Sequence, residues 1–139
     1  MSQQVWLDAN VLLRFLRKDH PTHSPLAARL FQKASLGEVK LYISAVTISE
    51  VFYAYTTFYK LTPAQTAKEI IPFFRTGFAE LEDFDCLLDA LNKVSEENVD
   101  FGDAYLAAGA VKAGVRVASF DKHLKRFKDV ELYDFEGEV

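Results

Sequence analysis

The chain has 139 residues, half of them hydrophobic, and a formal net charge of −4. This length fits one domain over residues 1–139, and the composition excludes an intrinsically disordered chain. No apolar run reaches the roughly 18 residues of a membrane span, and the net negative charge by itself argues against a polyanionic partner.

The first residues and the cysteine count bear on the cellular compartment. The opening stretch MSQQ shows no basic segment followed by an apolar one, so no secretory signal is expected. The single cysteine, Cys86, excludes an internal disulfide and fits a reducing compartment. We therefore expect a cytoplasmic protein in which Cys86 is buried on a helix face.

Apolar periodicity and turn residues predict strands that alternate with helices along the chain. The predicted strands cover residues 3–8, 40–45, 78–81, 115–120 and 130–133. The predicted helices cover about 10–18, 24–37, 47–59, 87–91 and 100–114, with another from 62, which Pro72 either kinks or ends, and a short basic helix after 121. This alternation predicts an α/β fold with a mainly parallel sheet of four to five strands and helices on both faces.

Three of the predicted helices carry a recognisable start signal. Ser24, with a proline directly after it, has the form of an N-cap. The stretch from Thr47 to Glu50 has the form of a capping box, and Asp100 and Asp103 are related in the same way. These positions are expected to begin helices.

Four acidic residues stand where strands end or helices begin. Asp8 ends the first strand, and Glu50 lies one turn into the helix after the second. Asp103 lies in the first turn of a later helix, and Asp121 directly follows the strand 115–120. Because ligand sites of open parallel sheets lie beyond the carboxyl ends of the strands, we expect the four side chains to converge at one edge.

Four ionised carboxylates at one edge repel each other unless a cation binds between them. Mg²⁺ and Mn²⁺ prefer oxygen ligands and keep waters that leave room for a phosphate. Such a metal polarises a phosphodiester and lowers the pKa of a bound water, which a carboxylate can orient or deprotonate. The predicted chemistry is metal-dependent hydrolysis of nucleic acid. The three histidines, His20, His23 and His123, form no cluster suited to zinc, and we interpret them as surface residues.

Each acid also has a purely structural interpretation. Glu50 would complete the capping box, and an acid in the first helical turn, such as Asp103, gains roughly 0.3–1 kcal/mol from the helix dipole. Asp8 and Asp121 suit turns or caps. This interpretation requires four separate coincidences at matching positions, which favours a shared site.

Two basic clusters interrupt the acidic average, RFLRK at 14–18 and KHLKRFK at 122–128. They are either solvated helix faces or contacts to phosphates. In the second case the phosphate contacts would be Arg14, Arg17, Lys122, Lys125 and Arg126.

Four motifs of the chain resemble those of PIN-domain ribonucleases. They are LDANVLL at 7–13, SEV at 49–51, DFGDAYLAA at 100–108 and SFD at 119–121. The resemblance covers nearly the whole chain, and the VapC type of toxin–antitoxin systems is the most similar subgroup.

The resemblance implies a three-layer α/β/α sandwich and a Mg²⁺- or Mn²⁺-dependent endoribonuclease. Position by position, it implies the acidic quartet Asp8, Glu50, Asp103 and Asp121 as catalytic metal ligands. It implies supporting roles for Asn10 and Ser119, whereas Asp100 either assists or only caps its helix. It further implies an RNA substrate, a homodimer and a small antitoxin protein that blocks the site.

Two other function classes stay open. A Mg²⁺-dependent phosphatase or a receiver domain also uses acids at the ends of parallel strands. A haloacid-type phosphatase, however, has a second aspartate where this chain has Asn10, and a receiver has a lysine at the late strand end where this chain has Asp121. The other class is a non-catalytic RNA- or protein-binding module on the same fold.

Overall fold

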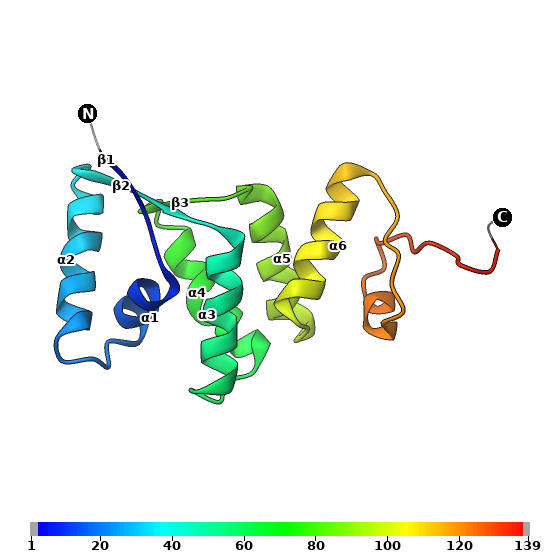
Figure 1. Cartoon of the computed structure of the whole chain (residues 1–139), viewed down its shortest axis with the longest axis horizontal. Helices are drawn as coiled ribbons and strands as arrows, with labels where there is room; N and C mark the ends of the chain where they lie inside the picture. The colour runs from blue at the N-terminus through cyan, green and yellow to red at the C-terminus, as the bar shows by residue number, and fades with distance from the viewer. Residues whose placement is uncertain (1–2, 138–139) are drawn as a thin grey trace.

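The computed structural model describes residues 3–137, which form three β-strands, six α-helices and one short 3₁₀ helix (Figure 1). The strands are β1 (Gln3–Trp6), β2 (Val39–Ile43) and β3 (Ala79–Leu81). The α-helices are α1 (Ala9–Arg17), α2 (His23–Ser35), α3 (Ala45–Thr57), α4 (Pro63–Phe74), α5 (Phe84–Glu97) and α6 (Phe101–Ala113), and the 3₁₀ helix is η1 (Lys122–Arg126).

The strands form one parallel sheet in the order β1-β2-β3. Val5 pairs with Leu41, and Leu41 pairs with Ala79 on the other side. Two helices connect each strand to the next, as parallel neighbours require. The predicted α/β fold with a parallel sheet is therefore confirmed.

One face of the three strands forms part of the core, whereas the other is open. Leu41, Ile43 and Leu81 are buried, while the alternate positions Lys40 and Glu80 are exposed. In Figure 1, α1 to α4 lie below the strands, and α5 and α6 lie beyond their carboxyl ends. On the second face the strand positions are polar or aromatic and stay accessible.

The sheet has three strands in the described chain, where four to five were predicted. The segments 115–120 and 130–133 form instead one isolated parallel bridge, between Val117 and Leu132. Val117 donates its N–H to the Glu131 carbonyl at 2.9 Å and accepts from the Tyr133 N–H at 2.8 Å. Because the two segments satisfy these groups mutually, neither adds a strand beside β1.

The observed helix starts correct two of the three predicted signals. Helix α2 begins at His23, so Ser24 is not its N-cap, and the His20 Nδ1 accepts from the His23 N–H at 2.9 Å. Helix α3 begins at Ala45 with Ser44 as N-cap, so the capping box from 47 to 50 is wrong and Glu50 lies in the second turn.

The other two helix predictions concern α6 and α4. Asp100 is the N-cap of α6 as predicted, and Gly114, at a φ of +70°, ends that helix. Helix α4 continues past Pro72 to Phe74, so the proline does not end it.

The core gathers apolar side chains from all six α-helices, including Leu12, Phe31, Val51, Ile70, Leu87 and Ala104. The expected burial of Cys86 is confirmed. Over residues 3–137, none of the helices combines the length and the apolar character needed to cross a membrane.

Candidate metal centre

Asp103 lies in the first turn of α6, where its backbone N–H donates to the Asp100 carboxylate at 3.2 Å. Phe101, two residues before Asp103, is buried against Phe52 of α3, with ring centroids 5.0 Å apart. The cap and the stacked ring together hold the start of α6 in place. Asp103 itself is partly exposed, so its carboxylate can reach a ligand.

Asp121 lies in a turn just before η1 that its neighbours order through hydrogen bonds. The Asp121 N–H donates to Ser119 Oγ at 2.9 Å, and the Asp121 carboxylate accepts from the His123 N–H at 2.9 Å. The His123 Nδ1 lies 3.1 Å from the same carboxylate oxygen. Ser119 and His123 therefore restrain the direction of this acid.

The structure brings Asp103 and Asp121 together with His123, and these three residues are called the acid group below. One ligand atom from each of the three residues lies within 4.8 Å of the others. Around one Mg²⁺, ligand atoms bonded at about 2.1 Å lie at most about 4.2 Å apart, so this spacing is close to that of a shared ion.

The electrostatics of this group favour a bound cation. Burial raises the pKa of the Asp103 carboxyl, and the neighbouring carboxylates of Asp100 and Asp121 raise it further, while His123 acts in the opposite direction. A divalent cation would relieve this repulsion between carboxylates. The donor set, two carboxylates and an imidazole, is one that divalent metals accept.

A cleft of about 190 Å³, called the acid cleft below, opens beside this group. Asp100, Asp103 and His123 line it, and Arg126 and Asn98 add further polar groups to the lining. A cation site next to an arginine can receive a phosphate, because the guanidinium binds phosphate oxygens through two parallel hydrogen bonds.

Asp8 and Glu50 lie outside the group of three in the described chain. Asp8 is the N-cap of α1, and its carboxylate accepts from the Asn10 N–H at 3.4 Å. Glu50 is exposed on α3, one turn after Thr47. Thr47 donates its hydroxyl to the Leu7 carbonyl at 3.2 Å, and this bond ties α3 to the end of β1, next to Asp8.

The basic residues of the sequence analysis fall into two groups. Lys122, Lys125 and Arg126 are exposed on η1, beside the acid group. Arg17 Nη1 instead donates to both carboxylate oxygens of Glu69 of α4, at 3.0 and 3.1 Å, and the guanidinium lies 4.5 Å from the Tyr59 ring centre. This engagement argues against Arg17 as a phosphate contact.

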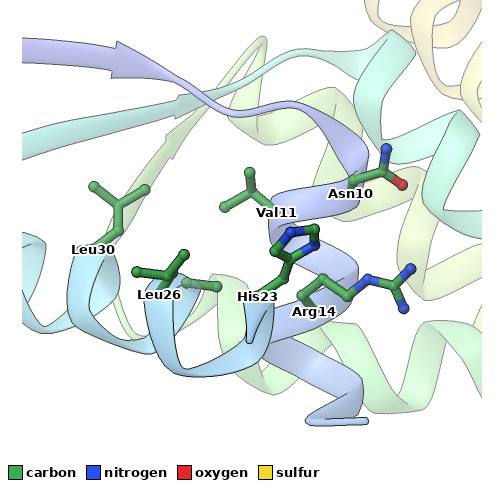
Figure 2. A pocket seen from close by; sticks show the side chains of 7 residues that line it. Asn10, Val11, Arg14, His23, Leu26 and Leu30 are labelled. Atoms are coloured by element: carbon green, nitrogen blue, oxygen red, sulfur yellow. The ribbon is translucent and has the colours of Figure 1, made fainter. Parts of the chain in front are cut away.

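A second, mainly apolar groove of about 380 Å³ lies between α1 and α2, apart from the acid group (Figure 2). In Figure 2, Leu26 and Leu30 of α2 face Val11 of α1, and His23 and Arg14 lie toward one end. Asn10 also lines this groove. Arg14 lies 3.4 Å from Asp19, and 33% of its side chain is exposed.

Two residues near the proposed acids were given no part in the site by the sequence analysis. His123 is exposed, as expected, but it joins the acid group, and the Asp-x-His spacing after 120 was a usable signal. Glu82 directly follows β3 and accepts from the Ala45 N–H at 2.8 Å. It therefore helps to cap α3, the helix that carries Glu50.

Comparison with protein-family models matches residues 5–130 to the PIN domain, a fold that is generally a nuclease fold and that typically binds divalent metals. No curated protein matches the chain in a sequence search.

Proposed function

Since the chain belongs to the PIN domain family, we propose that it is a metal-dependent endoribonuclease that hydrolyses phosphodiester bonds of RNA. The observation that carries the proposal is the group of Asp103, Asp121 and His123, with ligand atoms within 4.8 Å, beside a cleft that Arg126 lines. Metal-dependent hydrolysis of nucleic acid requires a cation and a phosphate side by side, and this cleft offers partners for both.

The metal would be Mg²⁺ or Mn²⁺, held by the carboxylates of Asp103 and Asp121. When bound, such an ion polarises a phosphodiester and makes a water more acidic. The chain's own residues keep the two carboxylates oriented. Asp100 accepts from the backbone of Asp103, and Ser119 accepts from the backbone of Asp121.

We propose Asp8 and Glu50 as the other two carboxylates of a catalytic quartet. The hydrogen bond from Thr47 to Leu7 supports this assignment, because it joins the two elements that carry them. The stack of Phe52 on Phe101 joins α3 to α6 in the same way. Asn10, two residues after Asp8, is proposed as a supporting polar residue.

RNA would be held by cations around the cleft. Lys122, Lys125 and Arg126 are exposed on η1 and form no ion pair with a carboxylate among residues 3–137, which supports contacts to phosphates. Arg14 is a further proposed contact, at the carboxyl end of α1. Arg17 is omitted because Glu69 already binds its guanidinium.

We further propose that the chain is the toxin of a VapC-type toxin–antitoxin pair, acting as a homodimer. The support is the resemblance of the LDANVLL and DFGDAYLAA motifs. Exposed Val46 and Tyr53, one face of α3, support a contact between copies. A small antitoxin protein would cover the acid cleft.

The test is cleavage of mixed cellular RNA by the purified chain in Mn²⁺, in Mg²⁺ and in EDTA, beside Asp103→Asn. Discrete cuts that need metal and disappear in the variant would support the proposal, and the cut sites would identify the RNA. Intact RNA with either metal, from protein free of any bound small partner, would contradict it.

The separation of Asp8 and Glu50 from the group of three favours one second candidate, a PIN-fold module that binds RNA without cutting it. RNA binding that is the same with and without EDTA, together with intact RNA, would support this candidate.

A further inference from the structure

The acid cleft contains a nitrogen donor, the imidazole of His123. Its Nδ1 lies 3.1 Å from the Asp121 carboxylate, and its ligand atom lies within 4.8 Å of those of Asp103 and Asp121. His123 also lines the cleft of about 190 Å³. The imidazole is therefore placed where it can share an ion with both acids.

A nitrogen donor changes which metal a carboxylate site prefers. Mg²⁺ takes oxygen ligands almost exclusively, whereas affinity for sites that contain nitrogen increases along the first-row divalent metals, from Mn²⁺ onward. We propose that His123 is a third protein ligand of the metal bound by Asp103 and Asp121, and that it makes the centre selective for Mn²⁺ over Mg²⁺. The proposal rests on the proposed metal-dependent function, and it adds a ligand and a metal preference to it.

The local backbone supports this role of His123. Ser119 accepts from the Asp121 N–H, and the Asp121 carboxylate accepts from the His123 N–H, so the three residues form one ordered turn. Leu124, the next residue, is buried and anchors η1 in the core. His123 is thus held next to Asp121 by the fold, although its own side chain is largely exposed.

The other two histidines provide a matched control. His20 and His23 stack on each other at the start of α2, with ring centroids 4.1 Å apart. The His20 Nδ1 already accepts two backbone N–H groups, from Thr22 and His23. His23 is exposed and lies outside the acid group, so His23→Ala removes an imidazole without touching the proposed site.

The first experiment detects the ligand directly. Mn²⁺ is added to the full chain, and electron spin echo modulation reports whether a ¹⁴N nucleus is bonded to the bound ion. We expect the nitrogen signal in the wild type and in His23→Ala, and its loss in His123→Ala. A wild-type centre that binds Mn²⁺ without a nitrogen signal would overturn the proposal.

The second experiment measures selectivity by titrating each variant with Mn²⁺ alone and with Mg²⁺ alone in a calorimeter. Loss of an outer-shell partner of a metal ligand costs roughly 10- to 100-fold in affinity, and His123→Ala should weaken Mn²⁺ by at least that factor while Mg²⁺ changes little. Equal losses for both metals would refute the selectivity. Asp103→Asn should weaken both.

The two proposals can fail separately. If Mn²⁺ is nitrogen-ligated but RNA is not cut, the nuclease function fails and the ligand assignment stands. If RNA is cut equally by the wild type and by His123→Ala in either metal, and no nitrogen signal is seen, the ligand assignment fails and the nuclease function stands.

Discussion

The rings of Phe52 on α3 and Phe101 on α6 stack with their centroids 5.0 Å apart and their planes 12° from parallel. Both side chains are buried. This stack joins the helix that carries Glu50 to the helix that carries Asp103. It is therefore both a core contact and a support for the proposed site.

Replacing Phe101 with alanine should destabilise the fold by about 3–5 kcal/mol, the usual cost of removing a buried phenyl ring. Urea unfolding measures the change. Phe58→Ala is the matched control, because Phe58 is 72% exposed and its loss should cost within about 0.5 kcal/mol. Similar losses of unfolding free energy in the two variants would show that the buried stack of Phe101 on Phe52 adds no stability.

The carboxyl of Asp103 should make metal-free protein less stable as the pH rises. Its pKa is raised in the folded state by burial, then by Asp100 and Asp121, from an ordinary value of 3.8. The folded state therefore holds this proton longer than the unfolded chain, and stability falls as the pH rises through the interval between the two pKa values. In EDTA, Asp103→Asn should lose less stability than the wild type as the pH rises, because it lacks this carboxyl. Unfolding midpoints of both proteins between pH 3.5 and 7 measure the difference. The same dependence of the midpoint on pH in both proteins would contradict the prediction.

His20 should make α2 sensitive to acid. Its Nδ1 accepts two backbone N–H groups at the start of α2, which only an unprotonated nitrogen can do. Burial lowers its pKa, and His23 and Arg14 lower it further, while Asp19 raises it. Stability from this cap is present above the ordinary pKa of 6.5 and is lost as the pH falls below it.

The variant His20→Asn keeps a hydrogen-bond acceptor that does not titrate. We expect its unfolding midpoint to change less than that of the wild type between pH 7.5 and 5.5. His23→Ala separates the cap from the neighbouring charge, since it removes the second imidazole and leaves the backbone donors in place. A wild type and a His20→Asn variant with the same slope would exclude the cap as the source.

The ion pair of Arg17 and Glu69 should contribute to stability and not to RNA binding. The guanidinium binds both carboxylate oxygens, at 3.0 and 3.1 Å, and about 70% of each side chain is covered. Arg17→Lys keeps the charge but loses the planar guanidinium that lies 4.5 Å from the centre of the Tyr59 ring, and should cost roughly 1–2 kcal/mol. Arg14→Lys, whose contact with Asp19 is longer and more exposed, should change unfolding little. A large loss of RNA affinity in Arg17→Lys at unchanged stability would contradict this assignment.

Arg126 should contribute to RNA affinity through its charge. The Asp103→Asn background is used because this change is expected to abolish the proposed cutting. In it, Arg126→Ala should weaken binding and reduce the slope of log affinity against log salt by about 0.7, the value for one phosphate contact to a single strand. Fluorescence anisotropy over a range of salt concentrations measures the slope. Lys33→Ala, on α2, is the charge-matched control and should leave the slope unchanged.

Local sequence signals determined most of the secondary structure of this protein. The alternation of apolar residues predicted β1, β2 and β3, and the Asp100 cap and Gly114 predicted both ends of α6. The acidic character of the site was also visible, because Asp103 and Asp121 each follow a local pattern. Such features depend on residues within about four positions of each other, so they can be read without the fold.

Only the tertiary structure decided which side chains meet. Residues 115–120 have the pattern of a strand, but their partner is Leu132 and not β1, so Asp121 lies with Asp103 and His123 while Asp8 lies outside that group. Arg17 looked like a surface cation until α4 placed Glu69 against it, 52 positions along the chain. Strand partners and ion pairs of this kind depend on how distant elements pack, and the free energy of that packing is not encoded in any local pattern.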